Sequence, residues 1–155
     1  MLALWQKKIG LFNLAVLICT LLSYGCSKTT PVKLGKELKY KGSTLFYTSK
    51  VTEDEARRFG DYLLGNGFFQ EDKPGTVQLT KEGKVYQFRM VVKKSVAKDM
   101  SYIGNAGIFA AHISKDVFNG KKVEIHLCDN KFRTLRTVTY NITPESLEEP
   151  TKISD

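Results

Sequence analysis

Three side chains that could support nucleophilic or metal chemistry follow one another at a spacing of two near the end of the chain. They are Glu124, His126 and Cys128, and residues two apart on an extended strand point to the same face. A thiol beside an imidazole and a carboxylate is the arrangement of a Cys–His nucleophile, and the same side chains are zinc ligands. However, only His112 remains among the histidines to complete a zinc site, and no segment supplies an oxyanion hole. The sequence therefore predicts no catalytic residue, metal ligand or cofactor, and a hydrolase with a His/Cys/acid site is the rival hypothesis.

A second group of side chains suits binding rather than catalysis. It consists of polar and basic residues that we expect to point outward from two hairpins of a sheet: Gln87, Arg89, Lys93, Arg133 and Arg136. Such a surface could bind an acidic polymer, a glycan or a partner protein, and the alternative is a merely solvated sheet face. Nucleic acid is not an expected partner, because the aromatic residues Tyr86 and Phe88 alternate onto the apolar face and not onto the basic one.

Local patterns indicate the elements that must position these residues. Residues 43–49 contain Thr, Leu, Phe and Tyr, which favour a strand. Thr52 and Glu55 form a capping box, so we expect a helix from there to the glycines at residues 65–67. Apolar and polar residues then alternate through residues 77–92, which is the pattern of a hairpin with one covered and one wet face.

The second half of the chain follows the same plan. Residues 100–118 place apolar side chains on one helical stripe behind Asp99 as the cap, and residues 123–140 alternate as a final hairpin. The two helix–hairpin stretches match weakly at a spacing of about 46 residues. The sequence thus predicts an α+β domain in which one antiparallel sheet of about five strands carries two helices on one face. This is a two-layer sandwich in the order β-α-β-β-α-β-β.

The first residues of the chain carry a targeting pattern. Lys7 and Lys8 precede an apolar run over residues 9–22, which is too short for a spanning helix and is typical of an export signal. The stretch Leu22-Ser23-Tyr24-Gly25-Cys26 then resembles the lipobox of bacterial lipoprotein precursors. This resemblance implies that a lipid is attached to the Cys26 thiol and that the chain is cleaved just before it. Cleavage without a lipid and an uncleaved signal anchor are the alternatives.

Composition places the rest of the chain among soluble globular proteins. The 155 residues include 24 Lys and Arg against 16 Asp and Glu, a net charge of +8, which excludes collagen-like, mucin-like and multi-span membrane chains. Of the three cysteines, Cys19 would leave with the signal and Cys26 would carry the lipid, so Cys128 has no disulfide partner. We expect Cys128 to be a half-buried small apolar residue.

Charge and turn residues suggest how the chain is divided. We expect a lipoprotein signal peptide over residues 1–25, a basic tether over 26–41, a small α+β domain over 42–141 and a flexible acidic tail over 142–155. The lysines of the tether could contact anionic lipid head groups, or could simply keep a solvated linker extended.

One stretch of the domain has a partial family resemblance. The run from Tyr47 through Ala56 to Leu64, followed by Gly67 and Phe68, resembles the first strand and helix of SPOR domains. SPOR domains are periplasmic modules with a split β-α-β arrangement that bind peptidoglycan glycan. The resemblance stops after this stretch, and it implies affinity for cell-wall glycan only by analogy.

These observations together predict an exported lipoprotein that Cys26 anchors to a membrane of the cell envelope. The expected role is that of a non-catalytic binding or interaction module. The expected partners are membrane lipid, held through Cys26, and an envelope protein or an acidic glycan. The alternatives are a cell-wall glycan-binding module and an envelope-acting hydrolase with the His/Cys/acid site.

Overall fold

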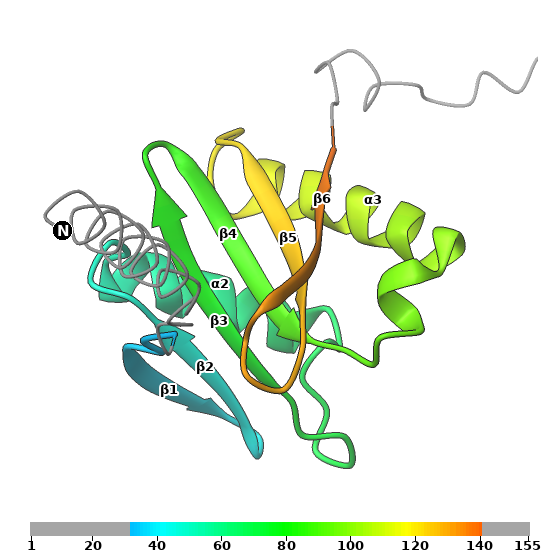
Figure 1. The fold of residues 1–155 in the computed structure, drawn as a ribbon. Coiled ribbons are helices and arrows are strands. Elements are labelled where there is room, and N and C mark those ends of the chain that lie inside the picture. Colours follow the sequence, from blue (N-terminus) through cyan, green and yellow to red (C-terminus); the bar gives the residue numbers. More distant parts are fainter. Residues whose placement is uncertain (1–31, 141–155) are drawn as a thin grey trace, which may run out of the picture. The chain divides into compact units, whose positions relative to one another are not determined.

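The computed structural model describes residues 32–140 of the chain (Figure 1). The predicted signal peptide, Cys26 and the predicted acidic tail lie outside the described residues, as does the first part of the predicted tether. Within residues 32–140, two α-helices and a six-stranded sheet form an α+β domain. No helix in this part of the chain is long and apolar enough to cross a membrane.

All six strands belong to one sheet and lie in it in the order of the chain. The elements are β1 (Lys36–Tyr40), β2 (Ser43–Tyr47), α2 (Glu53–Gly65), β3 (Thr76–Glu82), β4 (Val85–Val91), the short 3-10 helix η2 (Val96–Lys98), α3 (Met100–Asp116), β5 (Val123–Cys128) and β6 (Thr134–Thr139). Three antiparallel hairpins, β1–β2, β3–β4 and β5–β6, are joined by the parallel pairs β2–β3 and β4–β5.

The expected antiparallel sheet of about five strands is therefore corrected to a mixed sheet of six. The physical reason is the connection between neighbouring strands. A tight turn reverses the chain and gives an antiparallel pair, whereas a helical crossover brings the chain back in the same direction and gives a parallel pair. Because α2 joins β2 to β3 and α3 joins β4 to β5, two of the five pairings are parallel.

The strand that the sequence did not indicate is β1. It lies inside the segment predicted as a tether, and the predicted domain start at residue 42 falls after it. Three of its five residues are charged, so only Leu38 and Tyr40 mark an alternating pattern. These two side chains are half-buried and pack against the core, and pairing with β2 supplies the remaining stabilisation.

Each helix begins at a cap visible in the sequence. The capping box is confirmed, since the Thr52 side chain accepts from the Glu55 amide and the Glu55 carboxylate accepts from the Thr52 amide. Asp99 caps α3 by accepting from the backbone amides of Ser101 and Tyr102. Such caps satisfy amides that have no partner inside the helix, and therefore set where each helix starts.

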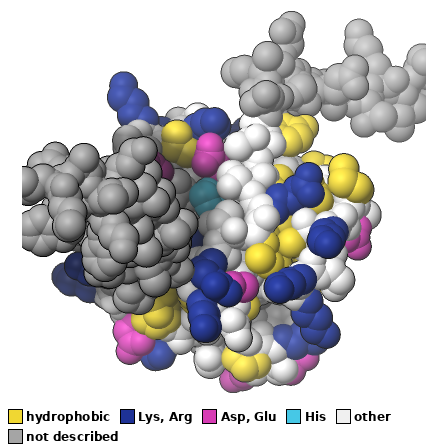
Figure 2. Space-filling model, viewed as in Figure 1, with side chains coloured by type: hydrophobic (Ala, Val, Ile, Leu, Met, Phe, Trp, Pro, Cys, Tyr) yellow, Lys and Arg dark blue, Asp and Glu magenta, His cyan; other side chains and the backbone are white. Residues whose placement is uncertain are grey.

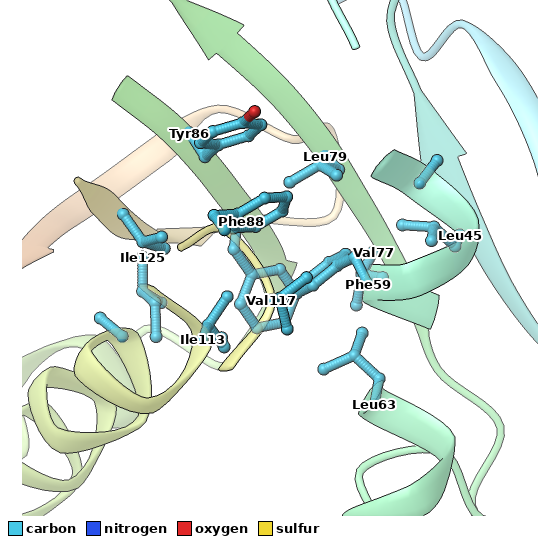
Figure 3. Packing of buried hydrophobic residues seen from close by; sticks show 14 of the residues in the cluster. Leu45, Phe59, Leu63, Val77, Leu79, Tyr86, Phe88, Ile113, Val117 and Ile125 are labelled. Atoms are coloured by element: carbon cyan, nitrogen blue, oxygen red, sulfur yellow. The ribbon is translucent and has the colours of Figure 1, made fainter. Parts of the chain in front are cut away.

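Both helices pack against the same face of the sheet, where the core lies (Figure 3). Phe59 of α2 is fully buried, and the centre of its ring lies 5.0 Å from that of Phe88 in β4. Ile113 of α3 is also fully buried among the apolar residues of the strands, such as Leu79 and Ile125. Burial of each such side chain contributes about 1.5–3 kcal/mol.

Because side chains alternate along a strand, the residues between these apolar positions point to the opposite face. No helix of residues 32–140 covers that face, which is turned toward the viewer in Figure 1. We call it the helix-free face.

The weak internal repeat has a structural counterpart. The units α2-β3-β4 and α3-β5-β6 each consist of a helix followed by a hairpin, and each helix makes the crossover to the first strand of its hairpin. Val77 and Val123, which match in the sequence, are both buried in these first strands.

Candidate functional site

The chemistry-bearing residues of the domain meet on the helix-free face. Four polar side chains stand opposite one another across neighbouring strands there: Gln78 of β3, Arg89 of β4, His126 of β5 and Thr137 of β6. We call these four residues the polar row. Directly paired residues in a sheet point to the same side, so the register alone brings them together from segments far apart in the sequence.

Gln78 is held at one end of the polar row by the segment that precedes β1. Its side chain is 1% exposed, and its amide nitrogen donates to the backbone oxygens of Lys33 and Leu34, at 2.8 and 2.9 Å. Gly35 allows the chain to turn here, because its φ is +93° and a Cβ would lie 2.1 Å from the backbone oxygen of Tyr47. The segment before β1 therefore fixes the orientation of the Gln78 amide.

Arg89, next to Gln78 in the polar row, has an incompletely satisfied guanidinium group. One terminal nitrogen of Arg89 donates to the backbone oxygen of Phe132, but its Nε is buried and has no hydrogen-bond partner among the described residues. A buried donor without an acceptor costs about 1–3 kcal/mol. This nitrogen lies out of reach of solvent, whereas the Arg89 side chain as a whole is only partly buried.

The turn between β5 and β6 holds the Phe132 oxygen over Arg89. Phe132 has a φ of 57°, the left-handed region that a bulky side chain rarely adopts, and its side chain is buried. The turn is held by Asp129, whose carboxylate accepts from the amides of Lys131 and Arg133, both at 2.9 Å, and also pairs with the Arg133 guanidinium. Hydrogen bonds from Arg133 hold the pKa of Asp129 at about 2, so this carboxylate stays charged.

His126 has partners on both ring nitrogens. Its Nδ1 lies 3.2 Å from the Thr134 hydroxyl, and its Nε2 lies 3.4 Å from the Glu124 carboxylate. Burial lowers the pKa of His126, the hydrogen bond to Glu124 opposes this shift, and the charge of Arg89 reinforces it. The imidazole is therefore mainly neutral at pH 7, and Arg89 carries the positive charge of the polar row.

Cys128 has the environment of a structural thiol. It is fully buried, and its sulfur donates to the backbone oxygen of His126 at 3.4 Å. Burial raises the pKa of this thiol, which opposes formation of the nucleophilic thiolate. His112 lies exposed on α3, beside Asp116, and so on the opposite side of the sheet from His126. The structure thus brings Glu124, His126 and Cys128 to one face but does not join the two histidines.

The structure separates the five residues that the sequence grouped as a binding surface. Gln87 and Arg89 lie on the helix-free face, and the Gln87 amide donates to Glu82. Lys93 follows the end of β4 and is exposed, and Arg133 is held in the turn by Asp129. Arg136 stands opposite the core residue Leu127, which places it on the other face. Figure 2, viewed toward the helix-free face as in Figure 1, shows lysine and arginine side chains at several places on this surface.

Three members of the polar row, Gln78, His126 and Thr137, were not among the predicted binding residues. Gln78 alternates with the buried Val77 and Leu79, so the period of two could have placed it beside Arg89 once the pairing of β3 with β4 was recognised. The sequence alone makes His126 a candidate only for catalysis or zinc binding. Its place between Arg89 and Thr137 depends on the parallel pairing of β4 and β5, which alternation within one strand does not indicate.

The polar row offers donors rather than metal ligands. Among the described residues, no group of three or more histidine, cysteine or acidic side chains could hold a metal ion. A guanidinium flanked by an amide and an imidazole is instead suited to a carboxylate or phosphate oxygen, which accepts charge-assisted hydrogen bonds.

Comparison with known proteins gives one match. The family model AF_1994_N, described as a family N-terminal domain, matches residues 37–140. This range begins within β1 and ends just after β6, so the match covers the described sheet except for Lys36. No curated protein and no solved structure matches the chain.

Proposed function

We propose that this chain, which belongs to the AF_1994_N family of N-terminal domains through residues 37–140, is a membrane-anchored lipoprotein of the cell envelope. Its domain acts as a non-catalytic binding module that holds an acidic partner on the helix-free face. The anchor rests on the lipobox-like stretch that ends at Cys26, and the binding role rests on the polar row.

The observation that carries the binding proposal is the guanidinium of Arg89, which is only partly buried and whose Nε lacks an acceptor among the described residues. A carboxylate on the helix-free face would pair with the guanidinium charge through the part of Arg89 that is exposed. Hydrogen bonds to charged groups contribute about 1.5–3 kcal/mol. Gln78 and His126 stand on either side of Arg89, so the polar row can also orient the uncharged atoms of the partner.

The contacts of Cys128 and His126, the candidate residues for a hydrolase site, favour binding over hydrolysis. The thiol of Cys128 donates to a backbone oxygen, and burial raises its pKa. His126 is engaged by Glu124 and Thr134. These partners favour a protonated thiol and an oriented imidazole over the thiolate and free base that a Cys–His nucleophile requires.

An acidic glycan is the first form of partner to test, because hydroxyl and amide groups surround the polar row. Thr80 and Gln87 are paired on the same face, the Thr80 hydroxyl lies 2.8 Å from that of Thr48, and Thr139 stands opposite Glu124. Hydroxyl and amide side chains can form hydrogen bonds with the hydroxyl groups of a sugar as readily as with the peptide groups of a protein. The resemblance to SPOR domains points in the same direction by analogy.

The test is to measure binding to two acidic polymers, polygalacturonate for a glycan and polyglutamate for a protein. Arg89→Gln should weaken binding to the preferred polymer by about 10-fold or more, since a charged hydrogen bond is lost. The matched control is Arg58→Gln, which changes an exposed arginine of α2, away from the helix-free face. Equal binding by the wild-type protein and by Arg89→Gln would contradict the assignment of the polar row.

A further inference from the structure

Two segments leave the sheet side by side at the ends of β4 and β5. The two strands are parallel, Val91 is paired with Cys128, and the Val92 amide donates to the Cys128 oxygen at 2.9 Å. In Figure 1 the loop that follows β4 and the turn that follows β5 lie at the lower ends of these strands. Together they carry four exposed lysines, which we call the basic patch: Lys93, Lys94, Lys98 and Lys131. The parallel pairing therefore brings lysines from two distant segments of the chain to one end of the sheet.

The acidic side chains of the same two segments are engaged by other groups. Asp129 pairs with Arg133, and Asp99 caps α3 by accepting from the amides of Ser101 and Tyr102. Among residues 32–140, no ion pair includes a lysine of the basic patch. The charge of the basic patch is therefore not neutralised within the described domain.

Other acidic residues lie among basic residues of their own. At the same end of the sheet, Glu71 and Asp72 lie in the connection from α2 to β3, and Lys73 follows them in the chain. At the opposite end, the Lys81 ammonium group lies 3.5 Å from the Glu55 carboxylate. The basic patch differs from both places, because its four lysines have no carboxylate partner among residues 32–140. It is suited to a negatively charged surface outside the domain.

Exposed apolar side chains accompany the basic patch. The loop after β4 is compact, since the Val96 amide donates to the Lys93 oxygen at 3.0 Å. Met100 comes two residues after Lys98 and is 71% exposed, and Val91, the last residue of β4, is 40% exposed. Lysines with exposed apolar neighbours suit the surface of a lipid bilayer, where the apolar groups enter the head-group region and the ammonium groups contact phosphates.

The chain enters the domain close to this end of the sheet. The backbone oxygens of Lys33 and Leu34 accept hydrogen bonds from the Gln78 amide. Gln78 is paired with Arg89, which is two residues, or about 7 Å, from the end of β4. Lys33 is seven residues after Cys26, and that length of chain spans at most about 25 Å. A lipid on Cys26 would therefore keep the basic patch within reach of the membrane surface.

We propose that the basic patch, with Met100 and Val91, is a membrane-binding surface of the domain whose partner is the anionic head groups of a lipid bilayer. The distance to the membrane rests on the proposed lipid anchor. The charge of the basic patch and the exposure of its apolar neighbours do not rest on it. The domain is thus held at the bilayer by its own side chains as well as by the lipid.

The test places a fluorescent label at either end of the sheet in the full chain, reconstituted into vesicles. Ser95→Cys puts the label in the loop after β4, and Ser49→Cys puts it after β2 at the opposite end; both serines are exposed. The vesicles contain phosphatidylcholine alone or mixed with anionic phosphatidylglycerol, and a quencher on the head groups reports how closely each label approaches. Phosphatidylglycerol should increase the quenching at Ser95→Cys by about twofold or more, should change that at Ser49→Cys little, and should lose this effect in high salt.

Charge removal identifies the lysines responsible. Each lysine near an anionic membrane strengthens binding by about fivefold, so Lys94→Gln with Lys131→Gln should lower the ratio of membrane-bound to free patch by about 10-fold or more. The matched control is Lys84→Gln with Lys121→Gln, which removes the same charge from exposed positions at the opposite end of the sheet. The control pair should leave the quenching at Ser95→Cys unchanged.

The outcomes separate this proposal from the anchor. Retention on phosphatidylcholine vesicles tests the anchor, whereas the added approach on phosphatidylglycerol tests the basic patch, so either can fail alone. Equal quenching of both labels, or equal effects of the two lysine pairs, would overturn the proposal. Binding of soluble polyglutamate through the basic patch without approach to anionic vesicles would reject the bilayer in favour of an acidic protein.

Discussion

The Glu55 carboxylate should make the stability of the domain depend on pH. It accepts from the Thr52 amide at 2.9 Å and from the Tyr86 hydroxyl, and Lys81 lies 3.5 Å away. Burial alone would raise the pKa of Glu55, but the hydrogen bonds from Tyr86 and Thr52 and the charge of Lys81 outweigh it and lower the pKa from 4.5 to about 2. Because the folded-state pKa is the lower one, this stabilisation is complete above about pH 4.5 and is lost as the pH falls toward 2.

The structure also gives the size of the effect. The lowered pKa corresponds to about 3 kcal/mol at neutral pH, and the Glu55 side chain is only 15% exposed, so solvent screens little of it. Tyr86→Phe removes the hydroxyl but keeps the ring, whose centre lies 3.8 Å from that of Phe118. We expect Tyr86→Phe to lower the free energy of unfolding by about 2 kcal/mol at pH 7, and by a smaller amount at about pH 3, because the stabilisation is lost only as the pH approaches 2.

The assay is urea unfolding of both proteins at several pH values between 7 and about 3. The matched control is Tyr62→Phe, whose lost hydroxyl contacts the exposed Asp116 at 3.3 Å and should change the free energy of unfolding by less than about 0.5 kcal/mol. If Tyr86→Phe destabilises the protein equally at pH 7 and at pH 3, the hydroxyl does not act through the ionised Glu55, and the reasoning is refuted.

Three further predictions test other parts of the account. Gly35→Ala should lower the free energy of unfolding by about 2–4 kcal/mol, because the added Cβ would overlap the Tyr47 backbone. Gly75→Ala is the control: the position has open space, so the free energy of unfolding should change by less than about 0.5 kcal/mol. Urea unfolding measures both changes. Cys128 should resist iodoacetamide in the folded protein and react in urea, and rapid labelling of the folded state would contradict its burial. For the proposed anchor, mass spectrometry should find a lipid on an N-terminal Cys26 and Cys26→Ala should leave the membrane fraction; an unmodified, uncleaved Cys26 would refute lipidation.

Local interactions made part of the fold predictable. The capping box at Thr52 and the Asp99 cap act within a few residues, so the sequence alone indicated where both helices begin. The alternation over β3, β4 and β5 likewise showed which side chains face the core. The direction of neighbouring strands was not available in this way, because it depends on which strands lie next to each other in the sheet.

The candidate site was predicted less completely, since it depends on register between strands. Gln87 and Arg89 lie two apart on one strand, and they do share the helix-free face. The position of Arg136 depends on the path of the five-residue turn before β6 and on the irregularity between Leu127 and Cys128, which place it opposite Leu127. The Gln78 amide is held by backbone oxygens about forty-five positions earlier in the chain, a contact that no local pattern reveals.

The central claim is that Arg89 is the group that binds an acidic partner. The most direct measurement is the nuclear magnetic resonance signal of the arginine Nε–H groups, recorded during titration with polygalacturonate and polyglutamate. The account predicts that the Arg89 Nε–H exchanges slowly with water in the free protein, because it is buried, and that its signal shifts more than those of the other arginines when one polymer is added. A signal from Arg89 that stays unchanged while the exposed arginines shift would contradict the account.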